Sequence, residues 1–336
     1  MSHVAVLGSG SWGTALALHL ARKGAQVSIW SCEPDQIEQI GTLRENRRFL
    51  PGHLLPDSVS VSGDMEAAVE DSDAVVFAVP SGAVREVGSL LSAIPAARAI
   101  PLVVNAAKGL EGDTGLRLSE VLRRTLPTEM GERLVVLSGP NLAVELANEV
   151  PTATVVASPG EDLCRRAQEL FRGRSFRVYW NRDVAGVELG GALKNVIAIG
   201  AGIGDGLGYG DNTKATLITR GLAEMTRLGV AMGAQSQTFQ GLSGVGDLMA
   251  TCASKLSRNL RLGMALGRGL TLEEAEREVG QVAEGAPTCR AAYELSHRLG
   301  IYVPIIEQVH HVCFEGKDPV TAVIDLMLAE PKSEFE

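Results

Sequence analysis

The sequence lacks a long apolar run, an excess of basic residues and a secretory leader, and each absence excludes a class of protein. No apolar stretch reaches the roughly 20 residues of a membrane span, and the N-terminus has neither a basic region nor a cleavage site. The formal net charge of −9 argues against a general surface for nucleic acid or anionic membranes, because both need a basic footprint. We therefore expect a cytoplasmic protein with no membrane span and no nucleic-acid partner.

Paired cysteines and clustered histidines are also missing. The five cysteines are scattered and none belongs to a C-x-x-C pair, which fits reduced thiols rather than disulfides or a zinc site. His310 and His311 are the only neighbouring histidines, and adjacent helical positions point about 100° apart. The sequence therefore predicts no metal site.

The pattern of apolar residues indicates two domains, consistent with a length of 336 residues. In residues 1–183, short apolar runs alternate with helical stretches such as 11–23 and 114–126. This alternation predicts an α/β domain with a doubly wound parallel sheet. The predicted strands are residues 4–7, 27–30, 74–79, 102–105 and 134–137, with 153–157 and 176–179 as further candidates.

Residues 184–336 show long helical patterns instead. Thr271 and Glu274 have the form of a capping box, and Pro304 and Pro319 suit the first turns of helices. We predict an all-α domain here. No flexible linker separates the halves, so we expect them to pack around a shared cleft.

A G-x-G-x-x-G motif lies between the first predicted strand and the first predicted helix. Gly8 permits a tight turn, Gly10 lets the backbone approach a pyrophosphate, and Gly13 allows close packing of helix on strand. The N–H groups and dipole of the helix start favour the pyrophosphate charge. Because a second strand follows and Glu33 lies about 20 residues beyond Gly13, the context predicts a dinucleotide-binding domain.

The sequence leaves the coenzyme open between NAD and NADP. Glu33, at the end of the second predicted strand, is suited to accept hydrogen bonds from the ribose hydroxyls of NAD. Arg44, Arg47 and Arg48 are close enough in sequence to meet the 2′-phosphate of NADP. Glu33 favours NAD.

Lys194 and Asn195 interrupt a segment of otherwise apolar or very small residues, 190–204. Lysine is rarely buried without a partner, and burial disfavours the charged form of an amine. Such an amine suits general acid/base chemistry near neutrality. The alternative is a lysine whose head group reaches solvent; we predict the catalytic role.

A second polar cluster lies between residues 241 and 259. Ser257, Arg258 and Asn259 supply a hydroxyl, a guanidinium and an amide where a helix over about residues 259–266 begins. Backbone N–H groups, helix dipole and guanidinium fork together predict a phosphate site, although Ser257 alone also suits a helix cap. Asp247, isolated among glycines and apolar residues, is a candidate to orient Lys194 or balance its charge, the alternative being a turn former.

Two loops after predicted strands complete the candidate site. Lys108 follows the fourth strand, and Gly139 and Asn141 follow the fifth. Open parallel sheets bind ligands outside the carboxyl ends of their strands. Lys108 therefore lies where a substrate oxygen or phosphate is expected, unless it is a solvated loop lysine.

Three segments together resemble the bacterial-type NAD(P)-dependent glycerol-3-phosphate dehydrogenases: residues 8–13, residues 191–212, and residues 244–248 with 257–259. The middle segment is the most specific, and the resemblance covers nearly the whole chain. It implies an N-terminal Rossmann domain, a helical C-terminal domain and a homodimer. It also implies the interconversion of dihydroxyacetone phosphate and sn-glycerol 3-phosphate, which feeds phospholipid synthesis.

The resemblance implies roles for individual residues. Lys194 is expected to accept and donate the proton, and Lys108 to lie between coenzyme and substrate. The residues expected at the coenzyme are Gly8, Gly10, Ser11, Trp12, Gly13, Cys32, Glu33, Lys108, Ala143, Arg258, Val282 and Glu284. Those expected at the substrate are Lys108, Gly139, Asn141, Lys194, Asp247, Ser257, Arg258 and Asn259.

Two positions depart from the family pattern. Cys32 stands where arginine or histidine is common, which weighs against NADP, and Asn141 stands where serine or threonine is usual. Three alternative functions share part of the pattern. A two-domain dehydrogenase of a 3-hydroxy acid or phosphogluconate needs a carboxylate site, and a ketopantoate-type reductase is a further possibility. A non-enzymatic NAD(H) sensor needs a DNA-reading or partner surface, and neither a basic winged helix nor a charge block is present.

Overall fold

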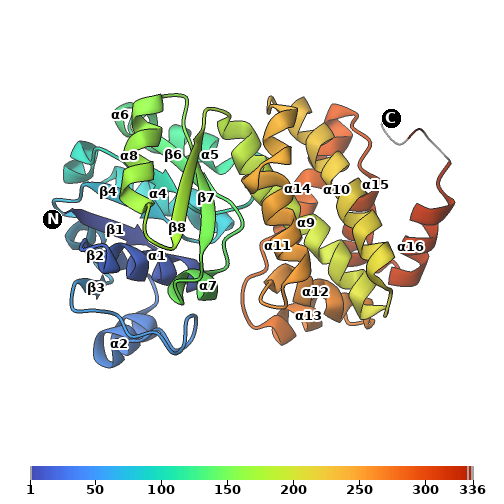
Figure 1. The fold of residues 1–336 in the computed structure, drawn as a ribbon, viewed down its shortest axis with the longest axis horizontal. Coiled ribbons are helices and arrows are strands. Elements are labelled where there is room, and N and C mark those ends of the chain that lie inside the picture. Colours follow the sequence, from blue (N-terminus) through green and yellow to red (C-terminus); the bar gives the residue numbers. More distant parts are fainter. Residues whose placement is uncertain (1, 331–332, 334–336) are drawn as a thin grey trace.

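The structure, a computed structural model, describes residues 2–330 and 333. Two bodies lie side by side: an α/β half built on one sheet and an all-helical half (Figure 1). The chain passes between them directly, because β8 (Phe176–Asn181) is followed at once by α9 (Val184–Gly206). The domain boundary at 183/184, close to this passage, stays a prediction.

One sheet of eight strands forms the centre of the α/β half, in the order β3-β2-β1-β4-β5-β6-β7-β8. Its other strands are β1 (His3–Leu7), β2 (Gln26–Trp30), β3 (Val59–Ser62), β4 (Ala74–Phe77), β5 (Val103–Asn105), β6 (Leu134–Ser138) and β7 (Thr152–Ala157). The seven predicted strands are all present, and β3 is an additional one at the edge. Strand β7 runs antiparallel to β6, so the prediction of a wholly parallel sheet was wrong in this one pairing.

Helices cover the faces of the sheet, which explains why β1, β4 and β5 are almost continuous apolar runs. They are α1 (Ser11–Arg22), α2 (Pro34–Leu43), α3 (Met65–Val69), α4 (Val84–Ser92), α5 (Leu118–Thr125), α6 (Thr128–Glu132), α7 (Ala143–Ala147) and α8 (Glu161–Phe171). The helix predicted over 114–126 begins only at Leu118, because Gly115 has a left-handed φ of +67° and directs the preceding residues into a turn.

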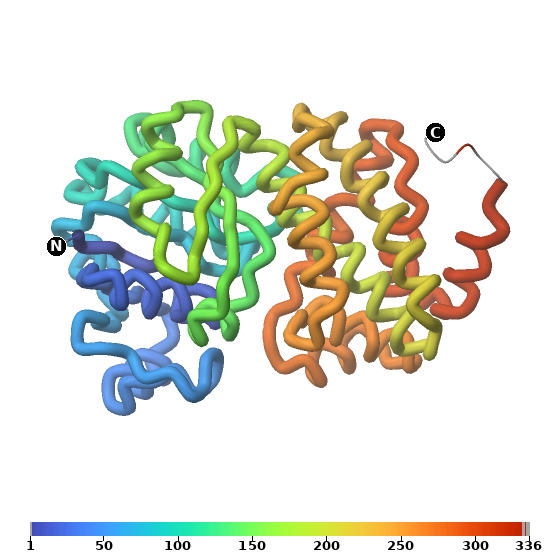
Figure 2. The backbone as a smooth tube through the Cα atoms, in the orientation of Figure 1, coloured from blue at the N-terminus to red at the C-terminus, as the bar shows by residue number. Residues whose placement is uncertain are grey.

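The second half is helical, as predicted. After α9 come α10 (Asp211–Ala231), α11 (Asp247–Ala253), α12 (Arg258–Gly267), α13 (Leu272–Val279), α14 (Gly285–Leu299), α15 (Pro304–Phe314) and α16 (Pro319–Leu328). The capping box of Thr271 and Glu274 is formed, and Pro304 and Pro319 occupy first turns. In Figure 2, α16 reaches away from the other helices near the C-terminal end of the chain.

Helix α9 is the core of this half, and its small residues have a packing reason. A Cβ on Gly202 would overlap the carbonyl of Leu260, and one on Gly263 would overlap the carbonyl of Ile199, so α9 and α12 lie backbone against backbone. By length and composition α9 resembles a membrane span, a run that the sequence analysis overlooked. However, 94% of its most apolar window is buried inside the protein, which is the position of a core helix.

Candidate active site

The turn between β1 and α1 is shaped to receive a phosphate group. Gly8 has a φ of +119°, and a Cβ on Gly13 would overlap the carbonyl of Gly8, so both positions need glycine. Nothing lies within 4 Å of the Cβ position of Gly10. Helix α1 has no side-chain cap and no acidic residue in its first turn, which leaves its first N–H groups and positive dipole end available. The residues present therefore fit the pyrophosphate of a dinucleotide.

Two further predicted coenzyme residues lie around this turn. Ser11 and Trp12 begin α1, and the indole Nε1 of Trp12 is buried without a hydrogen-bond partner among the described residues. A buried N–H without a partner is costly. Trp12 thus offers a donor that a ligand at this turn can satisfy.

At the end of β2, Glu33 forms an ion pair with Arg48 at 2.6 Å, and both side chains are about half exposed. Cys32 beside it is an exposed free thiol. The other two arginines are engaged differently: Arg44 donates to backbone carbonyls, one at 2.8 Å, and Arg47 pairs with another glutamate at 3.0 Å. Of the three arginines, the structure thus brings Arg48 to Glu33.

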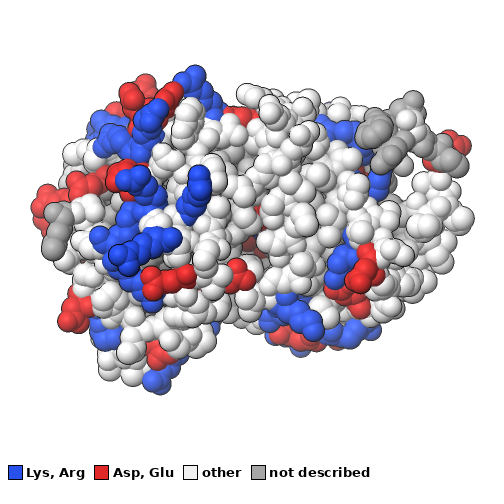
Figure 3. Space-filling view, viewed as in Figure 1, with Lys and Arg blue, Asp and Glu red and all other residues white. Residues whose placement is uncertain are grey.

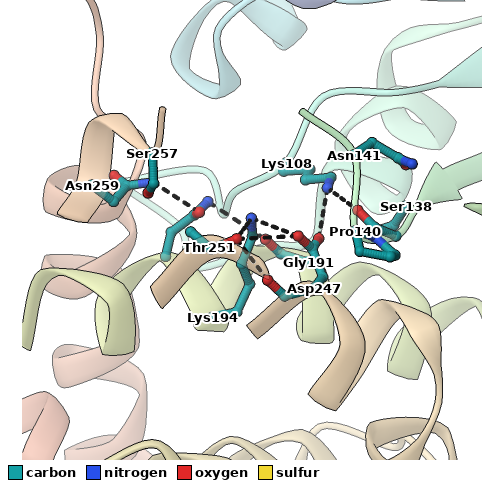
Figure 4. Close-up of polar contacts among 12 residues, drawn as sticks. Lys108, Ser138, Pro140, Asn141, Gly191, Lys194, Asp247, Thr251, Ser257 and Asn259 are labelled. Atoms are coloured by element: carbon teal, nitrogen blue, oxygen red, sulfur yellow. Dashed lines mark hydrogen bonds and ion pairs between the residues drawn. The ribbon is translucent and has the colours of Figure 1, made fainter. Parts of the chain in front are cut away.

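Two lysines from different halves meet on one buried carboxylate, that of Asp247 (Figure 4). Lys194 Nζ, from α9, lies 2.8 Å from Asp247 Oδ1. Lys108 Nζ, from the loop after β5, lies 2.6 Å from Asp247 Oδ2. Since Asp247 is only 1% exposed, its charge is compensated almost entirely by these two amines. The predicted pairing of Asp247 with Lys194 is present, and Lys108 joins it.

Each lysine uses two of its three N–H donors inside the protein. Lys194 Nζ also donates to Thr251 Oγ1 at 2.6 Å, and Lys108 Nζ also donates to the carbonyl of Gly139 at 2.8 Å. Every ammonium group therefore keeps one donor for a ligand. Two such donors beside a single carboxylate can stabilise negative charge that develops on a ligand oxygen.

Burial lowers the pKa of Lys108 from 10.5 to about 8. Desolvation is the largest cause, the charge of Lys194 acts in the same direction, and the carboxylate of Asp247 opposes both. Lys108 is therefore close to titrating in the physiological range, a property that the sequence analysis had associated with Lys194 alone.

Thr251 is a site residue that the sequence analysis missed. Its hydroxyl accepts the Lys194 hydrogen bond and lies on α11, four residues after Asp247. It donates to the backbone carbonyl of Asp247 at 2.6 Å. The signal was available, because residues i and i+4 of a helix share a face.

The start of α12 carries the predicted phosphate cluster. Ser257 caps the helix by accepting a hydrogen bond from Leu260 N, so its hydroxyl hydrogen remains free to donate. The guanidinium of Arg258 makes no hydrogen bond or ion pair to any residue that the structure describes. Desolvation lowers its pKa, with the Glu284 carboxylate acting against this shift. A largely buried cation without a direct partner is suited to an anionic ligand.

Asn259 lies in the same turn but is engaged in holding the helices together. Its Nδ2 donates to Asn195 Oδ1 on α9 at 2.8 Å, and its Oδ1 accepts from the backbone N–H of Gly285 at the start of α14. Asn195, the second polar residue of the apolar segment, thus positions Asn259. This network fixes α9, α12 and α14 around the candidate phosphate site.

The remaining predicted residues lie on several elements of both halves. Asn141 Nδ2 donates to the carbonyl of Ala153, and its Oδ1 is buried without a described partner. Ala143 begins α7. Glu284 accepts hydrogen bonds from Ser81 N and Ser81 Oγ, which joins the helical half to the loop after β4. Val282 is half exposed.

Comparison with known proteins identifies the family of the chain. Residues 3–164 match the family described as the NAD-dependent glycerol-3-phosphate dehydrogenase N-terminus, and residues 183–324 match the corresponding C-terminus. The chain belongs to this dehydrogenase family.

Members of the family are similar along their whole length. A glycerol-3-phosphate dehydrogenase [NAD(P)+] of Pelotomaculum thermopropionicum is 52% identical over 99% of this chain and 95% of its own. One from Thermoanaerobacter is 49% identical over 99% of this chain and 98% of its own. The crystal structure of glycerol-3-phosphate dehydrogenase from Coxiella burnetii covers 97% of this chain and 99% of its own, with a TM-score of 0.92 and 40% identity.

A ketopantoate reductase of Ralstonia eutropha shares the fold only, with a TM-score of 0.60 and 18% identity. The likeness explains why that reductase stood among the alternatives. It carries no information about the substrate.

Proposed function

We propose that this protein is an NAD(P)-dependent glycerol-3-phosphate dehydrogenase that interconverts dihydroxyacetone phosphate and sn-glycerol 3-phosphate. Two observations carry the proposal: the pair of lysines on Asp247, and Arg258 at the start of α12, whose guanidinium makes no hydrogen bond or ion pair to a described residue. The first group suits a carbonyl oxygen and the second suits a phosphate. Family membership supports the same reaction, and the product would serve phospholipid synthesis.

In this mechanism Lys194 donates a proton to the oxygen of the ketone during reduction and accepts it during oxidation. When bound, the nicotinamide coenzyme supplies or takes up the hydride. Asp247 and Thr251 hold the Lys194 amine by contacts of 2.8 and 2.6 Å, which leaves its third N–H for the substrate oxygen. Lys108 adds a second positive charge beside that oxygen. Both groups are already ordered before the reaction, so little reorganisation is required.

The phosphate of the substrate is assigned to the start of α12. Arg258 supplies a charged fork, Ser257 a hydroxyl hydrogen, and the helix its positive end. Asn259 completes the set, with its amide fixed by Asn195. This arrangement favours an acceptor with three oxygens, as a phosphate has. The carboxylate of a 3-hydroxy acid has fewer oxygens and would leave part of the arrangement unused.

For the coenzyme, we propose a preference for NAD over NADP. Glu33 places a carboxylate at the end of β2, where the 2′-phosphate of NADP would meet like charge. Arg48 is held by Glu33 in a 2.6 Å ion pair and is therefore engaged away from a 2′-phosphate. The turn of Gly8, Gly10 and Gly13 would hold the pyrophosphate of either coenzyme, so it does not distinguish the two.

A spectrophotometric assay tests the proposal. Dihydroxyacetone phosphate should be reduced with NADH, and more slowly with NADPH at equal concentration. Neither a 3-hydroxy acid nor 6-phosphogluconate should reduce NAD⁺ at a comparable rate. Turnover of either of these compounds without turnover of dihydroxyacetone phosphate would replace the proposed function with the alternative dehydrogenase.

We further propose that the protein acts as a homodimer in the cytoplasm. All five cysteines are free, and four are buried, which fits a reducing compartment. Exposed apolar side chains on α16, among them Ile324, Met327 and Leu328, are suited to a subunit contact. Light scattering on the purified chain measures the oligomeric state, and a monomer at micromolar concentration would contradict the dimer.

A further inference from the structure

An imidazole cluster lies on the helical half, on elements that the proposed reaction does not use. His310 and His311 are in the last turns of α15, and Glu315 is the residue that caps this helix. One ligand atom from each of the three residues lies within 4.8 Å of the other two. Two imidazoles and a carboxylate are a common ligand set for zinc sites that keep one open position.

The two histidines were considered as metal ligands from the sequence, but Glu315 was not. Adjacent histidines on a straight helix diverge, but the chain leaves helical geometry after Phe314, and the cap residue turns its carboxylate back over the last turn. Glu315 Oε1 lies 3.4 Å from His310 Nδ1, and Oε2 lies 3.8 Å from His311 Nε2. The carboxylate therefore faces both rings.

These spacings match a metal better than a hydrogen bond. His310 is 8% exposed, and its Nδ1 is buried without a hydrogen-bond partner among the described residues. Ligand atoms about 2.05 Å from a tetrahedral zinc ion are separated by roughly 3.3 Å. The 3.4 Å separation of Nδ1 and Oε1 is close to this value. His311 Nε2 lies 3.8 Å from Oε2, so the more exposed His311 and Glu315 side chains would have to move toward the ion to complete the set.

Aromatic packing holds the buried ligand in place. Tyr293 of α14 stacks on the His310 ring at 3.9 Å between centroids with an interplanar angle of 11°. Phe314 contacts the same ring at 5.0 Å. A ring fixed by neighbours loses little freedom when its nitrogen binds a metal, and such preorganisation favours binding.

We propose that His310, His311 and Glu315 form a binding site for one Zn²⁺ ion, with water in the fourth position. The ion joins the last turn of α15 to its cap and, through the stacked Tyr293, stabilises the packing of α15 against α14. The site is separate from Lys194 and Asp247 and has no part in the proposed reaction.

Calorimetric titration with Zn²⁺ tests the site, using the full chain with Cys32→Ser as the parent, because Cys32 is an exposed thiol. The parent should bind one Zn²⁺ per chain. His311→Gln and Glu315→Gln should each weaken binding about tenfold or more, since even the outer partners of metal ligands contribute this much. Glu294→Gln is the matched control: it removes a carboxylate whose charge acts on His310 but which lies outside the ligand set. Its affinity should equal that of the parent.

Thermal unfolding gives a second readout. At a fixed Zn²⁺ concentration, the ion should raise the Tm of the parent and of Glu294→Gln by more than that of Glu315→Gln, because the stabilisation falls as the affinity of the folded state falls. Reduction of dihydroxyacetone phosphate should be the same in the parent and in Glu315→Gln. Absence of one-to-one binding by the parent would overturn the proposal. So would equal affinities of the parent and Glu315→Gln, or equal losses in Glu315→Gln and Glu294→Gln.

Discussion

The two halves of the molecule offer different kinds of chemical groups to their expected ligands. In the α/β half, backbone N–H groups are offered by the turn of Gly8 and Gly13 and by the start of α1, which has no side-chain cap. The glycines are required here because they have no Cβ atom. In the helical half, Lys194 and Asp247 offer charged side chains paired in a buried contact, and Arg258 offers a guanidinium at the start of α12. The α/β half carries many charges on the surface seen in Figure 3, whereas the helical half shows few in that view.

This difference predicts a separation of effects. Removing Lys194 or Asp247 from the helical half should reduce chemistry or substrate binding and leave coenzyme binding intact. Lys108 is the exception, because it comes from the α/β half yet pairs with Asp247. The predictions that follow test this separation.

Lys194→Ala should have the largest effect. It removes the proposed proton donor, and such transfer contributes about 10²–10⁴ in rate, or about 3–5 kcal/mol. The kcat for reduction of dihydroxyacetone phosphate, followed by NADH absorbance, should fall by that factor. Lys317→Ala, at a surface lysine paired with Asp325, is the control and should retain full activity. Appreciable turnover by Lys194→Ala would remove Lys194 from the mechanism.

Arg258→Ala should act on substrate binding. A hydrogen bond to a charged group contributes about 1.5–3 kcal/mol, so KM for dihydroxyacetone phosphate should rise roughly ten- to a hundredfold. Arg268→Ala, near the other end of α12 and paired with Glu278 on the surface, is the matched control. An unchanged KM in Arg258→Ala would place the phosphate elsewhere.

The pH dependence of kcat/KM should report the titration of Lys108. Its pKa is lowered to about 8, so the amine is charged below that pH and loses its proton as the pH rises through it. Loss of this charge weakens attraction to the anionic substrate, so kcat/KM for reduction should decline above about pH 8. Lys108→Arg keeps a positive charge at all these pH values. The decline near pH 8 should therefore disappear in this variant, and its persistence would assign the titration to another group.

Glu33→Gln should have the smallest effect, and it concerns coenzyme choice alone. The change removes a negative charge near the expected 2′-phosphate and releases Arg48 from its 2.6 Å ion pair. Exposed ion pairs are worth about 0.2–1 kcal/mol, so the ratio of kcat/KM for NADPH to that for NADH should rise a few-fold. The KM for dihydroxyacetone phosphate should not change. A ratio equal to that of the wild type would show that Glu33 does not select the coenzyme.

Much of this architecture was predictable because local patterns determine it. Apolar runs gave seven of the eight strands, and the glycine spacing gave the β1–α1 turn. Strand β3 was not predicted because Val59–Ser62 is a short, half-exposed edge strand with alternating serines. The antiparallel course of β7 was not predictable, because an apolar run reads the same in both directions.

Most residues of the candidate site were predictable from the sequence, but not all of the contacts between them. Lys194 and Asp247 were recognised as isolated polar residues in apolar or glycine-rich surroundings, and Arg258 as part of a polar cluster at a helix start. That Lys108 and Lys194 share Asp247 depends on the packing of the two halves, which no local pattern contains. The contact of Ser81 with Glu284 has the same origin, since 203 positions separate the two residues.

The separation between the halves is tested most directly by titrating Lys194→Ala with NADH and following binding by fluorescence. If the α/β half holds the coenzyme through its backbone, the Kd for NADH should equal that of the wild type within about twofold, a difference of roughly 0.4 kcal/mol. A Kd at least tenfold weaker would contradict this account, because it would make the Lys194 side chain part of the coenzyme site.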